Sequence, residues 1–276
     1  ITNIGTAHIG ILGSRDNIDF EKKSACNYFN GNGKIFINAN DDYAEYLSTD
    51  IKGTAVFYSE KMHGISNVED CGLLGTTFNL ENEKIKFPLY GKYNFYDALG
   101  VIALAKDFNF SDEQIKVGIE KVKPLFGRAE VKNVKSKNGK NYTVILDCYN
   151  ANPDSMSESV DFCSKIKFAG KKYFVLGDMK ELGDDSVKEH RLLGKKINET
   201  DVSCAVLFGT EMTYAFSEVQ NIKAKYYENI SDTYIQNACE FLNSVIDEGD
   251  LILIKGSRSM RLERIANNLS GFGENK

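Results

Sequence analysis

The second half of the chain alternates short strand-like runs, some of them continuously apolar, with segments whose apolar residues recur at helical spacing. The strand-like runs fall at 142–147, 173–177, 203–208, 223–227 and 251–255. Helical patterns begin near residues 154, 186, 211 and 231, and a last one follows residue 255. A run such as YFVL at 173–176 shows no polar alternation, which is typical of a strand buried on both faces in a parallel sheet. The pattern predicts an α/β fold whose second domain is doubly wound and Rossmann-like.

Polar residues follow the apolar runs of this predicted sheet. Asp147, the pair Gly177-Asp178 and the pair Lys255-Gly256 each stand where a strand ends. Ligands of doubly wound sheets collect at the carboxyl ends of the strands. We therefore expect a functional site at this edge.

The first part of the chain has a different pattern, with short β patterns at 34–38, 53–59, 72–80 and 84–89 and a helical stretch at 93–108. The run SDEQ at 111–114 is a capping box, which predicts a helix from there to about Val122, ended by Pro124. The pattern changes near 125–127. We expect one domain over 1–126 and a second over 127–276.

Composition excludes several classes of protein. The chain has 276 residues, 42% of them hydrophobic and 26% charged, as in ordinary globular proteins. A net charge of −5 argues against nucleic acid or an anionic membrane as the main partner. The sequence contains no apolar run long enough for membrane insertion and no signal-peptide pattern. Its opening at Ile1 reads as the end of a strand, which predicts a fragment or a processed product.

The six cysteines are widely spaced and form no C-x-x-C pair. A chain of this length needs no disulfides to fold, so we expect buried thiols in a reducing cytoplasm and no zinc site.

The run NGNGKI at 30–35 is similar to a phosphate-binding loop in part only. That loop requires Gly where Tyr28 stands, and Ser or Thr where Ile35 stands. A hairpin turn before a strand is the better interpretation. A second turn is expected at 137–140.

The opening run TNIGTAH at 2–8 is by itself a strand-to-loop junction, and a single His such as His8 is more often structural than a metal ligand. Together with HIGILGSRDNI at 8–18 and Lys22, however, it resembles the Mur ligase family. The resemblance implies that His8 binds Mg²⁺ and that Lys22 is carbamylated and holds Mg²⁺ beside the γ-phosphate of ATP. Ser24 stands where the family often has Glu. The alternative for Lys22 is a solvated lysine in a charged run.

The run GKYNFYDA at 91–98 resembles the family element that contacts adenine. Asn94 matches that element, whereas Tyr93 replaces a His and Asp97 replaces an Asn. An aromatic face such as that of Tyr93 can stack on a purine. The alternative is that Asn94 caps the following helix.

Gly127-Arg128 with Glu130 resembles the interdomain motif of the family, and DCYNANP at 147–153 resembles the signature of its D-alanyl-D-alanine-adding branch. The resemblance implies that Arg128 and Asp147 bind the nucleotide, that Asn150 and Asn152 face the reacting centre, and that Ser155 lies near the substrate. Asn amides donate to an oxyanion without titrating. A turn followed by a helix from Pro153 is a structural interpretation that also holds.

Two further runs resemble the same branch: VLGDMKELG at 175–183, followed by His190, and KGSRSMRLE at 255–263. The resemblance places Asp178 and Arg258 near the substrate. Arg258 and Arg261 could instead brace the domain.

The resemblance implies that the parent protein is a cytoplasmic, monomeric ligase that uses ATP and Mg²⁺. It would join D-alanyl-D-alanine to UDP-N-acetylmuramoyl-tripeptide through an acyl phosphate, in peptidoglycan precursor synthesis. Since the chain has no phosphate-binding loop, we expect it to be inactive alone. Two alternatives remain: another amide ligase of the superfamily, such as a folylpolyglutamate synthase or the tripeptide-forming ligase, and a non-catalytic binding module derived from a ligase.

Overall fold

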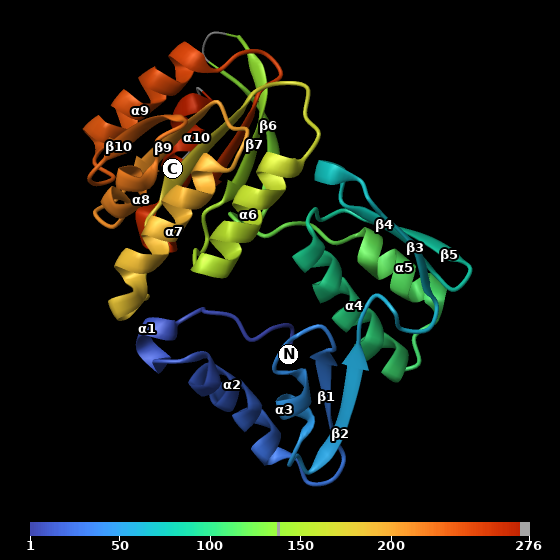
Figure 1. Cartoon of the computed structure of the whole chain (residues 1–276). Helices are drawn as coiled ribbons and strands as arrows, with labels where there is room; N and C mark the ends of the chain where they lie inside the picture. Colours follow the sequence, from blue (N-terminus) through green and yellow to red (C-terminus); the bar gives the residue numbers. More distant parts are fainter. Residues whose placement is uncertain (137–138, 271–276) are drawn as a thin grey trace. The chain divides into compact units, whose positions relative to one another are not determined.

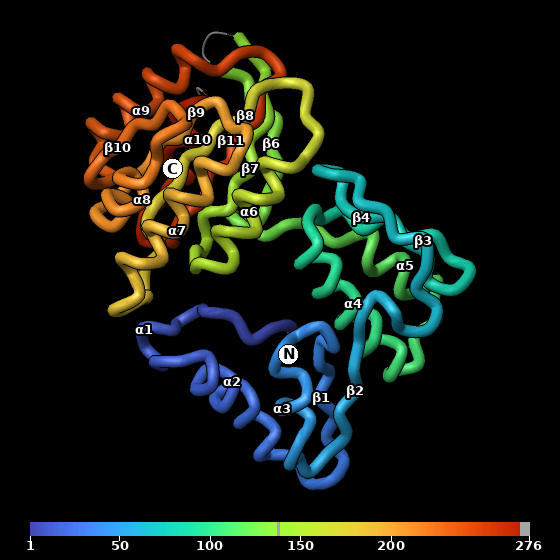
Figure 2. Tube along the Cα trace, in the orientation of Figure 1, coloured from blue at the N-terminus to red at the C-terminus, as the bar shows by residue number. Residues whose placement is uncertain are grey.

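The computed structural model describes residues 1–136 and 139–270 (Figures 1 and 2). By its contacts the chain divides into two compact units, Ile1–Lys123 and Pro124–Lys276. Two residues of the turn expected at 137–140, Lys137 and Asn138, lie outside the described residues. None of the helices in the described part of the chain is long and apolar enough to cross a membrane.

The first unit contains two small sheets and the helices around them. Its elements are α1 (Ile9–Leu12), α2 (Arg15–Lys23), a 3₁₀ turn η1 (Ser24–Tyr28), β1 (Gly33–Asn38), α3 (Ala44–Ser48), β2 (Gly53–Tyr58), β3 (Ile65–Asp70), a 3₁₀ turn η2 (Gly72–Leu74), β4 (Thr76–Leu80), β5 (Glu83–Phe87), α4 (Lys92–Asp107) and α5 (Asp112–Glu120). β1 and β2 pair in parallel, and β3, β4 and β5 form an antiparallel sheet in that order.

Helix α4 places one apolar side in a core of the first unit. Phe95, Leu99 and Ile102 are buried at helical spacing and join a core with the strand residues Phe78 and Ile85. A second core lies around β1, α2 and α3.

Several sequence predictions for this unit are confirmed. Strands lie at β1, β2 and β5, a helix lies at α4, and the capping box of Ser111 and Gln114 opens α5. The strand predicted at 72–80 is wrong in its first half, because Gly72–Leu74 turns as η2 and the strand begins at Thr76. The turn near residue 31 exists, but it joins η1 to β1 and is not a hairpin, since β1 pairs in parallel with β2.

The second unit is the doubly wound α/β domain that the sequence predicts. Its elements are β6 (Glu130–Lys135), β7 (Asn141–Asp147), α6 (Pro153–Lys165), β8 (Lys172–Gly177), a 3₁₀ turn η3 (Gly183–Asp185), α7 (Ser186–Asn198), β9 (Cys204–Phe208), α8 (Met212–Glu218), β10 (Lys223–Tyr227), α9 (Asp232–Val245), β11 (Leu251–Lys255), a 3₁₀ turn η4 (Arg258–Met260) and α10 (Glu263–Leu269). The strand order is β10-β9-β8-β11-β7-β6. All neighbours are parallel except β6, which runs antiparallel to β7 at one edge.

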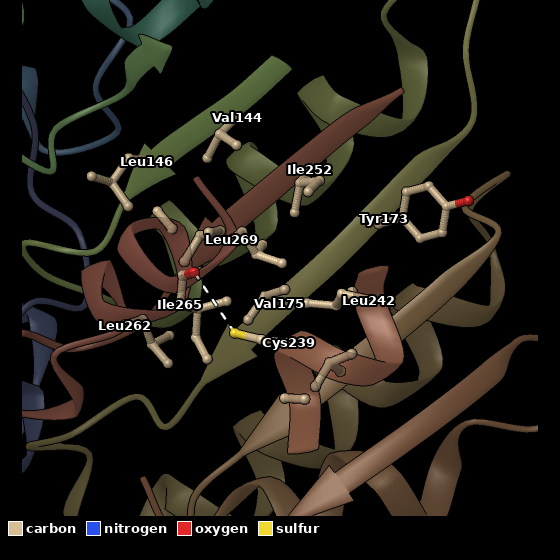
Figure 3. Packing of buried hydrophobic residues seen from close by; sticks show 14 of the residues in the cluster. Val144, Leu146, Tyr173, Val175, Cys239, Leu242, Ile252, Leu262, Ile265 and Leu269 are labelled. Carbon is tan, nitrogen blue, oxygen red and sulfur yellow. Dashed lines mark hydrogen bonds between the residues drawn. The ribbon is translucent and has the colours of Figure 1, made fainter. Parts of the chain in front are cut away.

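Helices cover both faces of this sheet. α9 and α10 pack on one face, where Leu242 and Ile265 meet Val175 and Ile252 (Figure 3), and α6, α7 and α8 cover the other (Figure 1). The strands β8, β9 and β11 are buried along their whole length, which explains their unbroken apolar sequence. All six cysteines are free thiols, and all but Cys71 are buried.

Candidate active site

The carboxyl edge of the sheet in the second unit brings together the polar strand ends that the sequence singled out. β11 lies between β7 and β8, and in its register Lys255 is opposite Asp147 on one side and Leu176 on the other. The polar residues that follow β7, β11 and β8 therefore stand side by side, as predicted.

Asp147 and Lys255 form a buried ion pair at this edge. Lys255 Nζ lies 2.6 Å from Asp147 Oδ2 and 3.4 Å from the carbonyl oxygen of Asn150. The hydroxyl of Ser159 on α6 donates to the same carboxylate oxygen at 2.9 Å, and the amide of Ala129 donates to the other oxygen at 3.3 Å. The carboxylate is thus held in one orientation and its charge is balanced by a lysine that water does not reach.

The loop after β7 positions the predicted asparagines differently. Asn152 is the N-cap of α6: its side chain accepts from the amide of Ser155 at 2.8 Å, and the Ser155 hydroxyl accepts from the amide of Asn152 at 3.1 Å. Pro153 occupies the first turn of the helix. Asn150 is exposed, and its side-chain oxygen accepts from the amide of Ala151. The predicted turn and helix are therefore confirmed, and the Asn152 and Ser155 side chains are engaged with each other in the cap.

Arg128 lies on the segment that leads into the second unit. The carbonyl of Gly127 accepts from the amide of Tyr149 at 2.9 Å, so this segment is fastened to the end of β7. The guanidinium of Arg128 stacks over the Tyr149 ring, 4.1 Å from its centroid. Arg258 pairs with Glu263 at 2.9 Å, and its guanidinium lies over the Phe126 ring, so it does brace its surroundings.

Asp178 is buried, and its side chain joins neighbouring loops. Its carboxylate accepts from the amide of Met212 at 2.9 Å and from Lys180 Nζ at 2.7 Å. Its backbone carbonyl accepts from the amide of Ser257. The Asp178 carboxylate fits here because residue 209 is glycine. A side-chain carbon at Gly209 would lie 2.3 Å from the carboxyl group, and the φ of Gly209 is +116°.

His190 and Ser257 stabilise the same loops, which sequence reasoning did not foresee. His190 Nε2 accepts from the amide of Met179 at 3.1 Å, and Nδ1 lies 2.8 Å from the carbonyl of Ser186. These partners require the neutral imidazole with its proton on Nδ1. Burial lowers the pKa of His190, which favours the same form. The Ser257 hydroxyl accepts from the amide of Lys180 at 2.9 Å. The available sequence signal was position: Ser257 lies within the run at 255–263, and His190 follows the run at 175–183.

A hollow of about 310 Å³ lies between α6 and α7, beside the asparagine loop. Met156 and Met179 give it an apolar lining, Asp154, Glu158 and Glu189 add carboxylates, and Lys196 adds an ammonium group. Its size and lining suit a small ligand that carries both an ammonium group and a carboxylate.

In the first unit, the predicted adenine-binding residues lie in the first turns of α4. Asn94 does not cap the helix: Gly91 is the N-cap, and the Asn94 side chain donates back to the carbonyl of Tyr90 at 2.7 Å. The Tyr93 ring packs against Gly91. Asp97 stands one turn further along, on the same side as Tyr93. Burial raises the pKa of Asp97.

His8 and Lys22 belong to the segment that forms α1 and α2. His8 is the exposed residue before α1, with a φ of 64°, and Lys22 lies in the last turn of α2. Lys22 Nζ donates to the carbonyl of Asn3 at 2.7 Å. Burial is the main cause that lowers the pKa of Lys22, and Asp41 opposes it. Ser24, where the family often has Glu, donates to the carbonyl of Glu21.

His8 and Lys22 are the residues that the resemblance assigns to Mg²⁺. Within residues 1–136 and 139–270, no three His, Cys, Asp or Glu side chains gather as a ready-made metal site. Any site at His8 and Lys22 thus needs a modified lysine or oxygen atoms of a bound ligand.

Comparison with known proteins agrees with the motifs. Residues 1–105 match the Mur ligase middle domain, and residues 127–258 match the Mur ligase glutamate ligase domain. A UDP-N-acetylmuramoyl-tripeptide–D-alanyl-D-alanine ligase of Treponema pallidum is 36% identical over 266 residues, which is 96% of this chain and 56% of that protein. The enzyme of the same name from Bacillus subtilis is 29% identical, over 98% of this chain and 58% of its own.

Solved structures show the same likeness. A crystal structure of MurF from Acinetobacter baumannii superposes with a TM-score of 0.84 at 25% identity, over 98% of this chain and 58% of that one. MurF from Thermotoga maritima in complex with ADP has a TM-score of 0.79 at 20% identity, over 97% of this chain and 60% of that one, and so supports the fold alone. The chain thus spans little more than half the length of the relatives it matches. From the two matched domains, the shared fold and the identity along nearly its whole length, the chain belongs to the Mur ligase family.

Proposed function

We propose that this chain is part of an ATP-dependent ligase that joins D-alanyl-D-alanine to UDP-N-acetylmuramoyl-tripeptide in peptidoglycan precursor synthesis. The observation that carries the proposal is the 36% identity, over 96% of the chain, to a relative named for this reaction. In this account residues 1–126 are the later part of an ATP-binding central domain, and residues 127–276 are the carboxyl-terminal ligase domain. The protein would act as a monomer in the cytoplasm.

The second unit would supply the nucleotide-facing and reacting groups. The Asp147 carboxylate is held in place by Lys255, and it can accept a hydrogen bond from a ribose hydroxyl. Arg128, resting on Tyr149, can swing to a phosphate at little loss, because a stacked, exposed guanidinium is only weakly held. Asn150, which is exposed, can donate its amide to the oxygens of a tetrahedral intermediate.

Other predicted residues would act by shaping the site. Asn152 and Ser155 fix the start of α6, and Asp178 fixes the loops after β8 and β9. Arg258, braced by Glu263, would lie at the rim. D-alanyl-D-alanine carries an ammonium group, two methyl groups and a carboxylate, which match the carboxylates, the methionines and Lys196 of the hollow beside the loop.

The first unit would help to hold ATP and Mg²⁺. Tyr93, Asn94 and Asp97 would face the adenine. A lowered pKa leaves more of the Lys22 amine neutral, which is the form that reacts with CO₂ to give a carbamate. The carbamate and the His8 imidazole would hold Mg²⁺ together with phosphate oxygens. When bound, Mg²⁺ would neutralise those oxygens.

One observation favours the alternative of a non-catalytic module. The sequence has no G-x-x-x-x-G-K-[ST] loop, and the partial match at 30–35 is a turn that joins η1 to β1. We therefore expect no ATP-dependent phosphate release from these 276 residues alone. Release from the isolated chain that depends on D-alanyl-D-alanine would contradict this expectation.

The role of Asn150 is tested in a protein that contains this chain and a phosphate-binding loop. Asn150→Ala should lower kcat about 100-fold, the loss typical of one oxyanion donor. Asn133→Ala is the control, because Asn133 lies on the edge strand β6 and contacts Thr143. Equal rates for the two variants would remove Asn150 from the reacting centre. Activity that is absent even in the unmodified protein would favour the binding module.

A further inference from the structure

The hollow between α6 and α7 has opposite charges at its two ends. Asp154 lies in the first turn of α6 and Glu189 in the first turn of α7, whereas Lys196 lies in the last turn of α7. All three line the hollow, and so does Glu158, one turn after Asp154. Since a helix rises about 1.5 Å per residue, Glu189 and Lys196 are roughly 10 Å apart along α7. The hollow therefore has an acidic end and a basic end.

The acidic end is the one at the carboxyl edge of the sheet. The amide of Met179, just after β8, donates to His190 near the start of α7, so α7 begins at this edge. Helix α6 also begins here, three residues after Asn150. At the opposite edge, Lys172 at the start of β8 donates to the carbonyl of Ser164 near the end of α6. The two helices thus run in the same direction, away from Asn150, and the basic end of the hollow lies further along them.

The charged groups at both ends are paired with partly exposed side chains, so a ligand can compete for them. Lys196 Nζ lies 2.8 Å from Asp161 Oδ2, and the two side chains are 25% and 35% exposed. An ammonium group has three N–H donors, so Lys196 can bind Asp161 and a second carboxylate together. Glu189 pairs with Lys188, whose side chain is 67% exposed. Pairs of this kind contribute little to stability and are readily shared.

A zwitterionic dipeptide matches this arrangement in length and in charge. Two extended residues span about 7 Å, and a hydrogen bond adds about 3 Å at each end. We propose that the hollow holds D-alanyl-D-alanine in one orientation, with its carboxylate on Lys196 and its ammonium group beside Asp154 and Glu189. The nitrogen that forms the new bond then stands at the edge where Asn150 lies, and Lys196 determines specificity for a free carboxylate. The inference rests on the proposed function for the identity of the ligand.

The test titrates the 276-residue chain with D-alanyl-D-alanine and with D-alanyl-D-alaninamide, which lacks the carboxylate. Lys196→Met should weaken binding of the dipeptide about tenfold, as expected for one hydrogen bond between charged groups, and leave binding of the amide unchanged. Lys195→Met is the matched control and should change neither, because this neighbour is exposed on another side of α7. No binding of the dipeptide to the unmodified chain, or equal losses for the two ligands, would overturn the proposal.

Asp161→Asn should give a change of the opposite sign. Asparagine can still accept from Lys196, but the competing negative charge is gone, so the dipeptide should bind about threefold more tightly. A lysine that serves only to stabilise the carboxyl end of α7 predicts weaker or unchanged binding in this variant. Either of those results contradicts the proposal.

Kinetics separate this inference from the proposed reaction. In a protein that contains this chain and a phosphate-binding loop, Lys196→Met should raise KM for the dipeptide about tenfold and leave kcat unchanged. Product formed with an unchanged KM would keep the reaction and remove Lys196 from the site. Binding that depends on Lys196, without any product, would contradict the proposed reaction and keep the orientation of the dipeptide.

Discussion

Replacing Lys255 with methionine tests the ion pair at the centre of the carboxyl edge. The Lys255 side chain is 2% exposed, and its partner Asp147 is 15% exposed. Methionine fills a volume similar to that of lysine, so the main effect of Lys255→Met is that Asp147 loses its charge partner. Removing one member of a buried pair typically destabilises a protein by about 3–5 kcal/mol. Because Asp147 keeps the Ser159 hydroxyl and the Ala129 amide, we expect the lower end, about 3 kcal/mol.

The assay is amide exchange of the strands β7 and β11, supported by urea unfolding. A loss of about 3 kcal/mol should speed globally protected amides roughly 100-fold. Lys172→Met is the matched control: Lys172 is 7% exposed, but its partner Asp201 is 64% exposed and becomes hydrated when left alone. We expect about 1 kcal/mol there. Adding Asp147→Asn to Lys255→Met should recover part of the loss. If Lys255→Met destabilises the protein no more than Lys172→Met does, the Asp147–Lys255 pair is not the more costly one to break.

Three further predictions concern single groups. Gly209→Ala should destabilise the protein by about 3 kcal/mol, because it adds a clash with the buried Asp178 carboxylate to the strain of a positive φ. Gly249→Ala is the control: its new side chain meets no atom within 4 Å, so only the strain of the positive φ remains, about 1 kcal/mol in urea unfolding. Equal losses in the two variants would contradict the clash. With ¹³C-bicarbonate, a carbamate NMR signal should survive Lys23→Arg and vanish in Lys22→Arg; its survival in both would exclude the predicted site. Burial holds the pKa of His190 below its ordinary 6.5 in the folded protein. Its contribution to the free energy of unfolding is therefore complete above pH 6.5. Below pH 6.5 the unfolded state takes up the proton first, so this contribution is lost as the pH falls toward and through the lower pKa of the folded protein. His190→Gln should flatten this part of the stability profile, and an unchanged slope would show that another group causes it.

The sequence predicted the parallel core of the second unit well because its strands are buried on both faces. β11 lies at the predicted residues, since LILIK at 251–255 can be little else than a buried strand. The edge strand β6 was missed. Its sequence EVKNVK is mostly polar, because one face and one edge of it meet water. The short helices α1 and α3 were missed for a related reason, since neither is long enough to show a helical period.

The candidate site was predictable as a set of strand ends, but not as a set of contacts. Asp147 and Lys255 are far apart in the sequence, and they pair only because β11 lies between β7 and β8. The link of His190 to Met179 likewise depends on how α7 packs. Asn152 could be read either way from its residue type, because the same amide can cap a helix or face a substrate.

The proposed reaction is tested most directly by identifying the product that a protein containing this chain, with a phosphate-binding loop before it, forms in the presence of ATP. We predict that UDP-N-acetylmuramoyl-tripeptide and D-alanyl-D-alanine yield the joined product by mass spectrometry, with one phosphate released for each bond. The proposal would be contradicted if this pair of substrates gave no product while the same protein used ATP to join glutamate to a folate, or a diamino acid to the shorter UDP-linked dipeptide.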